Sequence, residues 1–191
     1  MRAEPLHPII VAAAQGELPS WARVRPARRS HLASVARLLG QWASELGLPS
    51  LDTTRWIAAG WLHDALRDAA PSDLKEEAGD FPGRVRHGPA VAARLETAGI
   101  GDEELLEAIR YHSLGRGGMG RLGRFLYTAD YLEPGRPFDP AAHAAWRARM
   151  PEEHVAVLRW VCARRIAERL ERGKPIHRET LEFWNGVVGK A

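Results

Sequence analysis

Apolar side chains recur every three or four residues along most of this chain, and no stretch of any length shows the two-residue alternation of a half-buried strand. Gly47 and Pro49 stand where the first strong stripe stops, and both residues end helices. That stripe consists of Leu32, Val35, Leu39, Trp42 and Leu46. Internal repeats are absent from the sequence. The spacing therefore predicts a single all-α domain.

The same spacing places the remaining helices and their ends. Asp52 is expected to cap a second helix, which should continue through His63 and Asp64 to about Ala69, just before Pro71. A glycine-rich loop is expected at 115–120. Further helices are expected at about 89–99, 102–112, 122–134, 140–149 and 151–172, and from about 178.

Charge and cysteine content narrow the classes of function. The 191 residues include 27 Lys and Arg against 24 Asp and Glu, and residues 21–40 contain five arginines and no acid. Such a surface attracts polyanions, either nucleic acid or a phosphate-rich small molecule, although a solvated arginine-rich face is the plainer alternative. The single cysteine, Cys162, excludes an internal disulfide and a thiolate zinc cluster. No apolar run reaches the ~20 residues of a membrane span, so we expect a cytoplasmic protein.

Histidine and aspartate recur at the ends or inner faces of the expected helices. Any one of them is more often a packed, hydrogen-bonded residue than a ligand. Asp64, however, would be buried, and a buried carboxylate costs several kcal/mol unless it is paired or bound to metal. Imidazole and carboxylate together suit iron, manganese or zinc. The recurring set is His31, His63, Asp64, His87, His112 and Asp130, whereas His7, His143, His154 and His177 are expected at the surface.

Several short segments of the sequence resemble those of one protein family. The dyad in GWLHDAL (60–66) is that of the HD superfamily of metal-dependent phosphohydrolases. The segments RRSH (28–31), HGPAVAARL (87–95), AIRYHSLGRGGMGRLGRFLYTADYLEPGRPFD (108–139) and KPIHRETLEFWN (174–185) are similar to the YqeK-type bacterial members. This resemblance implies an HD-domain helical bundle over 25–191, with a metal site between helices, after a short N-terminal helical extension at 1–24. It also implies symmetrical hydrolysis of diadenosine tetraphosphate to two ADP.

Residue roles follow from that resemblance, position by position. The implied metal ligands are His31, His63, Asp64 and Asp130, with His87 and His112 available for a second ion. The implied catalytic residues are Asp64, His87, His112 and Arg67. The implied substrate contacts are Arg28, His87, His112, Ser113, Arg116, Tyr127, Asp130, Tyr131 and Arg136.

The resemblance also implies a cofactor and partners. One or two divalent transition metal ions are expected, iron first, with manganese, zinc and magnesium as alternatives. The expected partner is a dinucleoside polyphosphate that leaves as ADP, with no membrane and no nucleic acid; a homodimer is left open. Arg67 stands where the family usually has lysine, and Ser113 where it usually has threonine.

Two other functions remain open at this stage. One is an HD nucleotidase or phosphodiesterase acting on another nucleotide. The other, from a different class, is a nucleotide- or RNA-binding module with a catalytically silent metal site. The run Gly115 to Gly120 satisfies G-x-G-x-x-G, but a dinucleotide-binding fold needs a strand before that run, and here a helix is expected.

Overall fold

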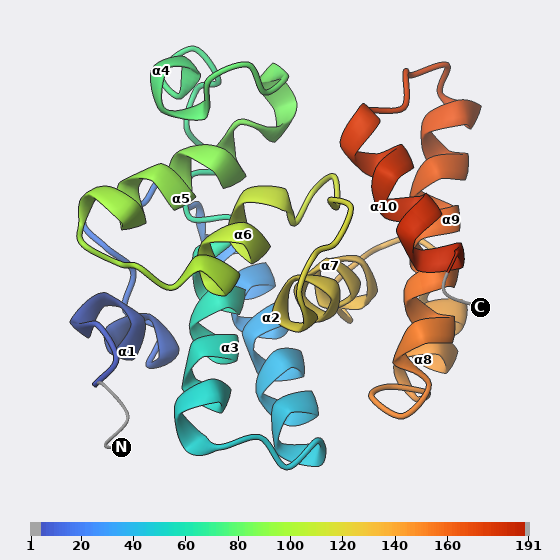
Figure 1. Ribbon diagram of the computed structural model, residues 1–191, viewed down its shortest axis with the longest axis horizontal. Coiled ribbons are helices and arrows are strands. Elements are labelled where there is room, and N and C mark those ends of the chain that lie inside the picture. The colour runs from blue at the N-terminus through green and yellow to red at the C-terminus, as the bar shows by residue number, and fades with distance from the viewer. Residues whose placement is uncertain (1–4, 190–191) are drawn as a thin grey trace.

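The computed structural model describes residues 5–189, and this part of the chain is helical without any strand (Figure 1). The all-α prediction is therefore confirmed for the described residues. In chain order the elements are α1 (Pro8–Ala14), α2 (Pro26–Glu45), α3 (Ser50–Leu62), α4 (Lys75–Ala78), the 3-10 turn η1 (Gly83–Val85), α5 (His87–Thr97), α6 (Glu103–Tyr111), α7 (Arg121–Leu132), α8 (Pro140–Arg147), α9 (His154–Glu171) and α10 (Arg178–Val188).

Helices α2 and α3 form the centre of the bundle, and they approach each other closely at Gly60. A Cβ added at Gly60 would lie 2.5 Å from the Cα of Ala36, so only glycine permits this spacing. Helix α7 packs across α2 and α3, where the Phe125 ring lies 4.8 Å from Trp56 and 6.0 Å from Trp42. The centre of the hydrophobic core therefore lies where α2, α3 and α7 cross.

The other helices surround that centre in two groups. Helix α1 packs on α3 through its buried Ile10 and Ala13, and α5 and α6 pack on each other. Helices α9 and α10 lie together on the far side of α7, with α8 beside them (Figure 1). The stretch 1–24 expected as an N-terminal extension contains α1, while its first four residues lie outside the described part. Buried residues from both groups form one continuous apolar cluster.

The second helix differs from its prediction at both ends. Helix α3 begins at Ser50, before Asp52, and Asp52 pairs with Arg55 at 2.7 Å instead of capping the helix. The helix also ends at Leu62, so the extension to Ala69 was wrong, and turns occupy 63–68. Neighbouring side chains on a straight helix point ~100° apart, and the turn lets His63 and Asp64 face the same centre.

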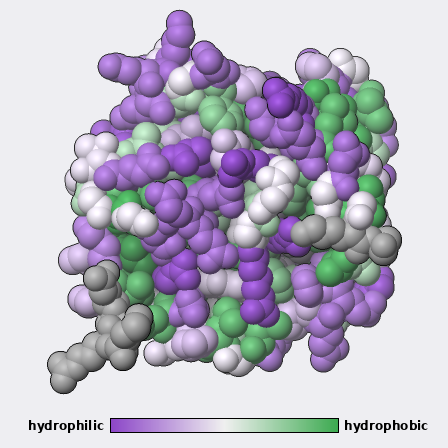
Figure 2. All heavy atoms as spheres, in the orientation of Figure 1, coloured by the Kyte–Doolittle hydropathy of each residue, from purple (hydrophilic) through white to green (hydrophobic). Residues whose placement is uncertain are grey.

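The surface seen in Figure 2 is mostly hydrophilic, with apolar residues scattered between charged ones. Among the described residues no helix is long and apolar enough to span a bilayer. One surface expectation was wrong, because His143 on α8 is only 2% exposed; Tyr131 and Phe138 pack against its ring.

Candidate metal centre

Six buried ionisable side chains meet where α2, α3, α5, α6 and α7 converge. Each comes from an element end or an inward helix face, which explains how residues distant in sequence share one centre. His31 lies on α2, His63 and Asp64 follow α3, His87 begins α5, His112 follows α6, and Asp130 lies on α7. The structure thus brings together all the histidines and aspartates implied as ligands by the resemblance.

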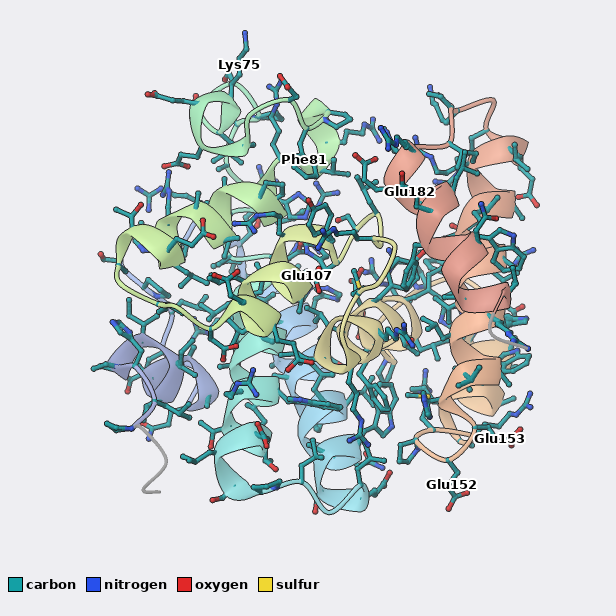
Figure 3. All side chains as sticks on the ribbon, viewed as in Figure 1. Lys75, Phe81, Glu107, Glu152, Glu153 and Glu182 are labelled. Atoms are coloured by element: carbon teal, nitrogen blue, oxygen red, sulfur yellow. The ribbon has the colours of Figure 1, made fainter. Side chains whose placement is uncertain are left out.

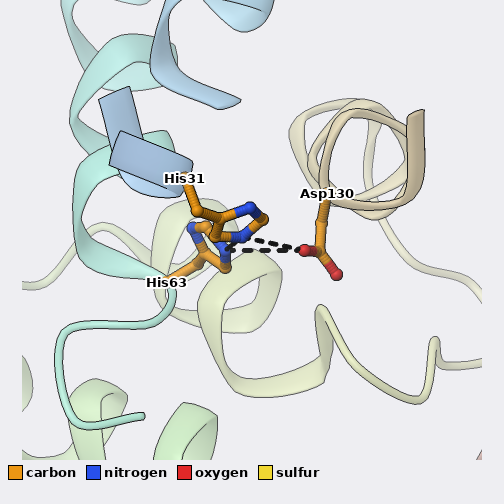
Figure 4. A group of neighbouring side chains, drawn as sticks. All are labelled: His31, His63 and Asp130. Carbon is orange, nitrogen blue, oxygen red and sulfur yellow. Dashed lines mark hydrogen bonds and ion pairs between the residues drawn. The ribbon is translucent and has the colours of Figure 1, made fainter. Parts of the chain in front are cut away.

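One half of the centre contains His31, His63 and Asp130 (Figure 4). The two histidine Nε2 atoms are 3.3 Å apart, and the Asp130 Oδ1 lies 3.1 Å from His31 Nε2 and 3.8 Å from His63 Nε2. Ligand atoms that each lie ~2.1 Å from one ion are about 3–4 Å from one another. These three atoms have the spacing of ligands to a single metal ion.

Asp64 connects this half to a second group. Its Oδ2 lies 3.8 Å from His31 Nε2 and 3.9 Å from His63 Nε2. Its Oδ1 lies 2.9 Å from His87 Nε2 and 3.3 Å from His112 Nε2, and those two nitrogens are 3.1 Å apart. Asp64 therefore has one oxygen toward each pair of histidines, and its carboxylate could help to hold an ion with either pair.

Hydrogen bonds fix which nitrogen each histidine presents. His63 Nδ1–H donates to the carbonyl of Gly60 and His112 Nδ1–H donates to the carbonyl of Ile109, both at 2.8 Å. His31 Nδ1 lies 3.2 Å from the Glu133 Oε1, a carboxylate oxygen that accepts its proton. Since Nδ1 is used in this way, the neutral form of each of these rings has its free lone pair on Nε2, and histidine ligands in metal sites are held by such contacts.

Burial and neighbouring charges set the protonation states. Burial lowers the pKa of His63 to about 3, which leaves a neutral imidazole. Burial alone would raise the pKa of Asp64, but its histidine neighbours together hold it well below the usual range. Burial opposes protonation of His31 as well, but hydrogen bonds to Asp130 and Glu133 outweigh it and raise that pKa to about 9. Without an ion, a proton on His31 therefore balances part of the carboxylate charge.

The donor set fits a divalent transition metal. Nε2 atoms of His31 and His63 face each other at 3.3 Å, an arrangement that is repulsive unless a proton or cation lies between or beside them. The carboxylates of Asp64 and Asp130 are ionised, because their surroundings hold both pKa values well below the usual range. Mixed imidazole and carboxylate sets suit iron, manganese and zinc, and neither group of candidate ligands among the described residues contains a cysteine.

Three arginines contact the two aspartates from outside. Arg28 Nη1 donates to the Asp64 Oδ2 at 2.9 Å, and Arg136 forms an ion pair with the Asp130 Oδ1. Arg165 on α9 donates to the Asp130 Oδ2 at 2.8 Å. Side chains of Arg28 and Arg136 are a quarter exposed, whereas that of Arg165 is 16% exposed. The first two can reach a ligand from solvent, and Arg165 mainly holds Asp130 in place.

Of the other residues implied as catalytic or substrate-binding, two lie at or near the metal centre. Ser113 Oγ lies 3.0 Å from His112 Nε2, inside the centre. Arg67 is exposed near His87 and donates to the carbonyl of Arg84 at 3.1 Å.

Three expected substrate contacts have other partners in the structure. Arg116 is exposed and pairs with Glu107, the residue of α6 that Figure 3 labels. Tyr127 is fully buried, and its ring packs against that of Phe183. The Tyr131 hydroxyl donates to Glu168 at 2.5 Å, on the α9 side of α7.

Two residues of the site escaped the sequence reasoning. Glu133 orients His31, and its position three residues after Asp130 on the same helical side was an available signal. Arg165 bonds Asp130 and also lies 4.2 Å over the Tyr127 ring, and nothing in the basic sequence around it separates it from surface arginines. A pocket of about 500 Å³ on the α2 side is lined by His31 and Glu133.

Comparison with known proteins agrees with this geometry. The HD domain family model matches residues 28–135, a segment that contains all six clustered side chains. The symmetrical bis(5'-nucleosyl)-tetraphosphatase of Staphylococcus aureus is 36% identical over 95 residues, covering 44% of this chain and 49% of that protein. The enzyme of the same name from Bacillus subtilis is 31% identical over 103 residues, covering 53% and 54%. The chain thus spans about half the length of the curated relatives it matches.

A solved structure extends the likeness of fold to nearly the whole chain. A Clostridium acetobutylicum protein, described as a predicted HD superfamily hydrolase involved in NAD metabolism, superposes with a TM-score of 0.74. The match covers 95% of this chain and 96% of that one at 23% sequence identity. At this identity the match concerns the fold, and it includes the helices beyond residue 135.

Proposed function

The chain belongs to the HD domain family, and from this premise we propose that it is a YqeK-type hydrolase that cleaves diadenosine tetraphosphate into two ADP. The observation that carries the proposal is the set of histidine Nε2 and aspartate oxygens within ligand distance of one another. The substrate comes from the relatives, since three matching proteins have the name symmetrical bis(5'-nucleosyl)-tetraphosphatase.

His31, His63, Asp64 and Asp130 would hold the metal ion, and His87 and His112 would help to hold a second one. We propose iron as the ion, because the mixed nitrogen and oxygen donors suit it. A divalent ion bound there would neutralise phosphoryl charge and lower the pKa of a coordinated water. The chain itself supplies the orientation, through the fixed Nδ1 contacts of His31, His63 and His112.

The arginines supply positive charge that complements the negative phosphates of the substrate. Guanidinium groups form paired hydrogen bonds to phosphate oxygens, and those of Arg28 and Arg136 are partly open to solvent. Each can exchange part of its contact with an aspartate for a contact with the substrate. On the opposite side of Asp64, the Ser113 Oγ lies 3.5 Å from the His87 Nε2, and this hydroxyl can donate to a developing charge.

Product analysis tests this function directly. The iron- or manganese-loaded chain is incubated with diadenosine tetraphosphate in heavy-oxygen water, and the nucleotides are separated by anion exchange and weighed by mass spectrometry. ADP should be the sole nucleotide product, because water attacks one inner phosphorus and the central bridging P–O bond breaks. One of the two ADP molecules should carry the heavy oxygen on its terminal phosphate.

Other outcomes reject the proposal. ATP with AMP would mean cleavage away from the centre, and a different HD nucleotidase or phosphodiesterase would then be the better description. Binding of diadenosine tetraphosphate by the metal-loaded chain without any hydrolysis would favour a binding module instead.

A further inference from the structure

A second recess lies beside the last turn of α7, the turn that also carries Asp130 of the metal centre. It occupies about 210 Å³ between the end of α7, the loop before α8 and one face of α9. Pockets that enclose a whole ligand are commonly ~300–1,000 Å³. This one suits a single ring system. Its lining residues are Tyr131, Phe138, Asp139, His143, Trp160, Arg164, Glu168 and Arg172.

Four of its eight lining residues carry aromatic rings, and the other four are charged. The Phe138 ring centroid lies 5.5 Å from that of Tyr131 and 4.9 Å from that of His143, and Trp160 lies 6.1 Å from Tyr131. Phe138 is 40% exposed although it is a large apolar side chain in a loop. The faces of such rings stack on the flat rings of nucleobases, and each stacked base strengthens binding by about fivefold or more.

The polar lining complements a heterocycle better than a phosphate. His143 is 2% exposed, and its Nδ1 has no hydrogen-bond partner in the described part of the chain. Carboxylates of Asp139 and Glu168 also line the recess and would repel a bound phosphate, although Arg164 and Arg172 lie beside them. A purine offers both amino groups that a carboxylate accepts and ring nitrogens that can pair with an imidazole.

We propose that this recess binds a purine base, namely the base of one half of the dinucleotide, a role that rests on the function proposed above. Its position supports this reading, because consecutive residues of α7 face the two sites. Asp130 faces the metal centre, and Tyr131 lines the recess. Arg136, which contacts Asp130, precedes Phe138 by two positions on the connecting loop. In this proposal the phosphates lie at Arg136 and the base lies against Phe138.

Binding of a nucleoside without phosphate separates this inference from catalysis. Adenosine is dialysed to equilibrium against the metal-loaded full chain, its Phe138→Ala variant and a Leu170→Ala control. Leu170 is a 64% exposed residue of α9 that does not line the recess. Adenosine should bind the unaltered chain and the control equally, and Phe138→Ala should weaken it at least about fivefold, the lower end for loss of one base–aromatic contact.

Pyrophosphate, tested in the same way, should bind the unaltered chain and Phe138→Ala with equal affinity. Equal adenosine affinity of Phe138→Ala and the unaltered chain would overturn the inference, as would a loss of pyrophosphate affinity alone. If adenosine binding depends on Phe138 but diadenosine tetraphosphate is not hydrolysed, the base site stands and the proposed reaction fails. If hydrolysis occurs with an unchanged KM in Phe138→Ala, the reaction stands and the base site fails.

Discussion

Gly60→Ala tests whether the close crossing of α2 and α3 sets the geometry of the metal centre. The new methyl would lie 2.5 Å from the Cα, 2.7 Å from the N and 3.0 Å from the Cβ of Ala36. Two of these three atoms belong to the backbone, so no rotamer change relieves the contact and the helices must separate. His63, which follows three positions later, donates to the Gly60 carbonyl and would move with α3.

The cost can be worked from these contacts. Overpacking in a tight core costs ~1–3 kcal/mol, and contact with backbone belongs at the upper end. Replacing glycine by alanine within a helix returns ~0.5–1 kcal/mol. The net destabilisation should be about 2 kcal/mol, which for a chain of this size lowers Tm by about 4–8 °C. Separation of the helices also widens the 3.3 Å gap between His31 and His63, so metal affinity should fall by about tenfold or more.

Thermal melts followed by circular dichroism, with and without metal, measure the first effect, and calorimetric metal titration measures the second. The matched control is Gly186→Ala on α10, where an added Cβ meets nothing within 4 Å. That control should melt at or slightly above the unaltered chain and bind metal normally. A Gly60→Ala variant that melts like the control, or binds metal with unchanged affinity, would refute the reasoning.

Four further perturbations address the centre itself. Asp64→Ala should lose nearly all bound transition metal while staying helical by circular dichroism. Arg136→Ala should keep the metal and raise KM, because Arg165 still holds Asp130. Elemental analysis that finds equal metal loss in both variants would contradict this. Glu133→Gln should weaken metal binding by about 10–100-fold through loss of the carboxylate on His31, and an unchanged titration would exclude that role. Removal of metal by a chelator should lower Tm and abolish hydrolysis, and both should return when the ion is restored. If the Tm were unchanged after chelator treatment, the folded centre would hold no stabilising metal ion, and this prediction would be wrong.

The sequence predicted most helices because their apolar stripes are read from local spacing alone. Gly47 and Asp102 mark ends that the structure confirms, with Gly47 in the left-handed region and Asp102 accepting from the Leu105 N–H. The end of α3 was not predictable in this way. Its boundary depends on His63 and Asp64 turning toward residues that are distant in sequence, and local propensity carries no record of that.

The site shows the same division. Its histidines and aspartates lie in sequence motifs that resemble those of the HD superfamily, so we could expect them to converge in the fold. The role of each as a ligand remains a prediction. Arg165 and His143 could not be found, because their importance depends on which face of α9 or α8 packs inward. Arg116 illustrates the converse, since a basic residue in a matching word pairs with Glu107 away from the centre.

The long sequence separation inside the centre has a kinetic consequence. His31 and Glu133 are 102 positions apart, and the turn after α3 lies between them. Contacts that close such long loops form late, after the local helices have been built. An ion held by both ends of this segment would then contribute little to the folding transition state. It should slow unfolding rather than speed folding, so loss of metal in a cell would shorten the lifetime of the folded chain without changing how fast new copies fold.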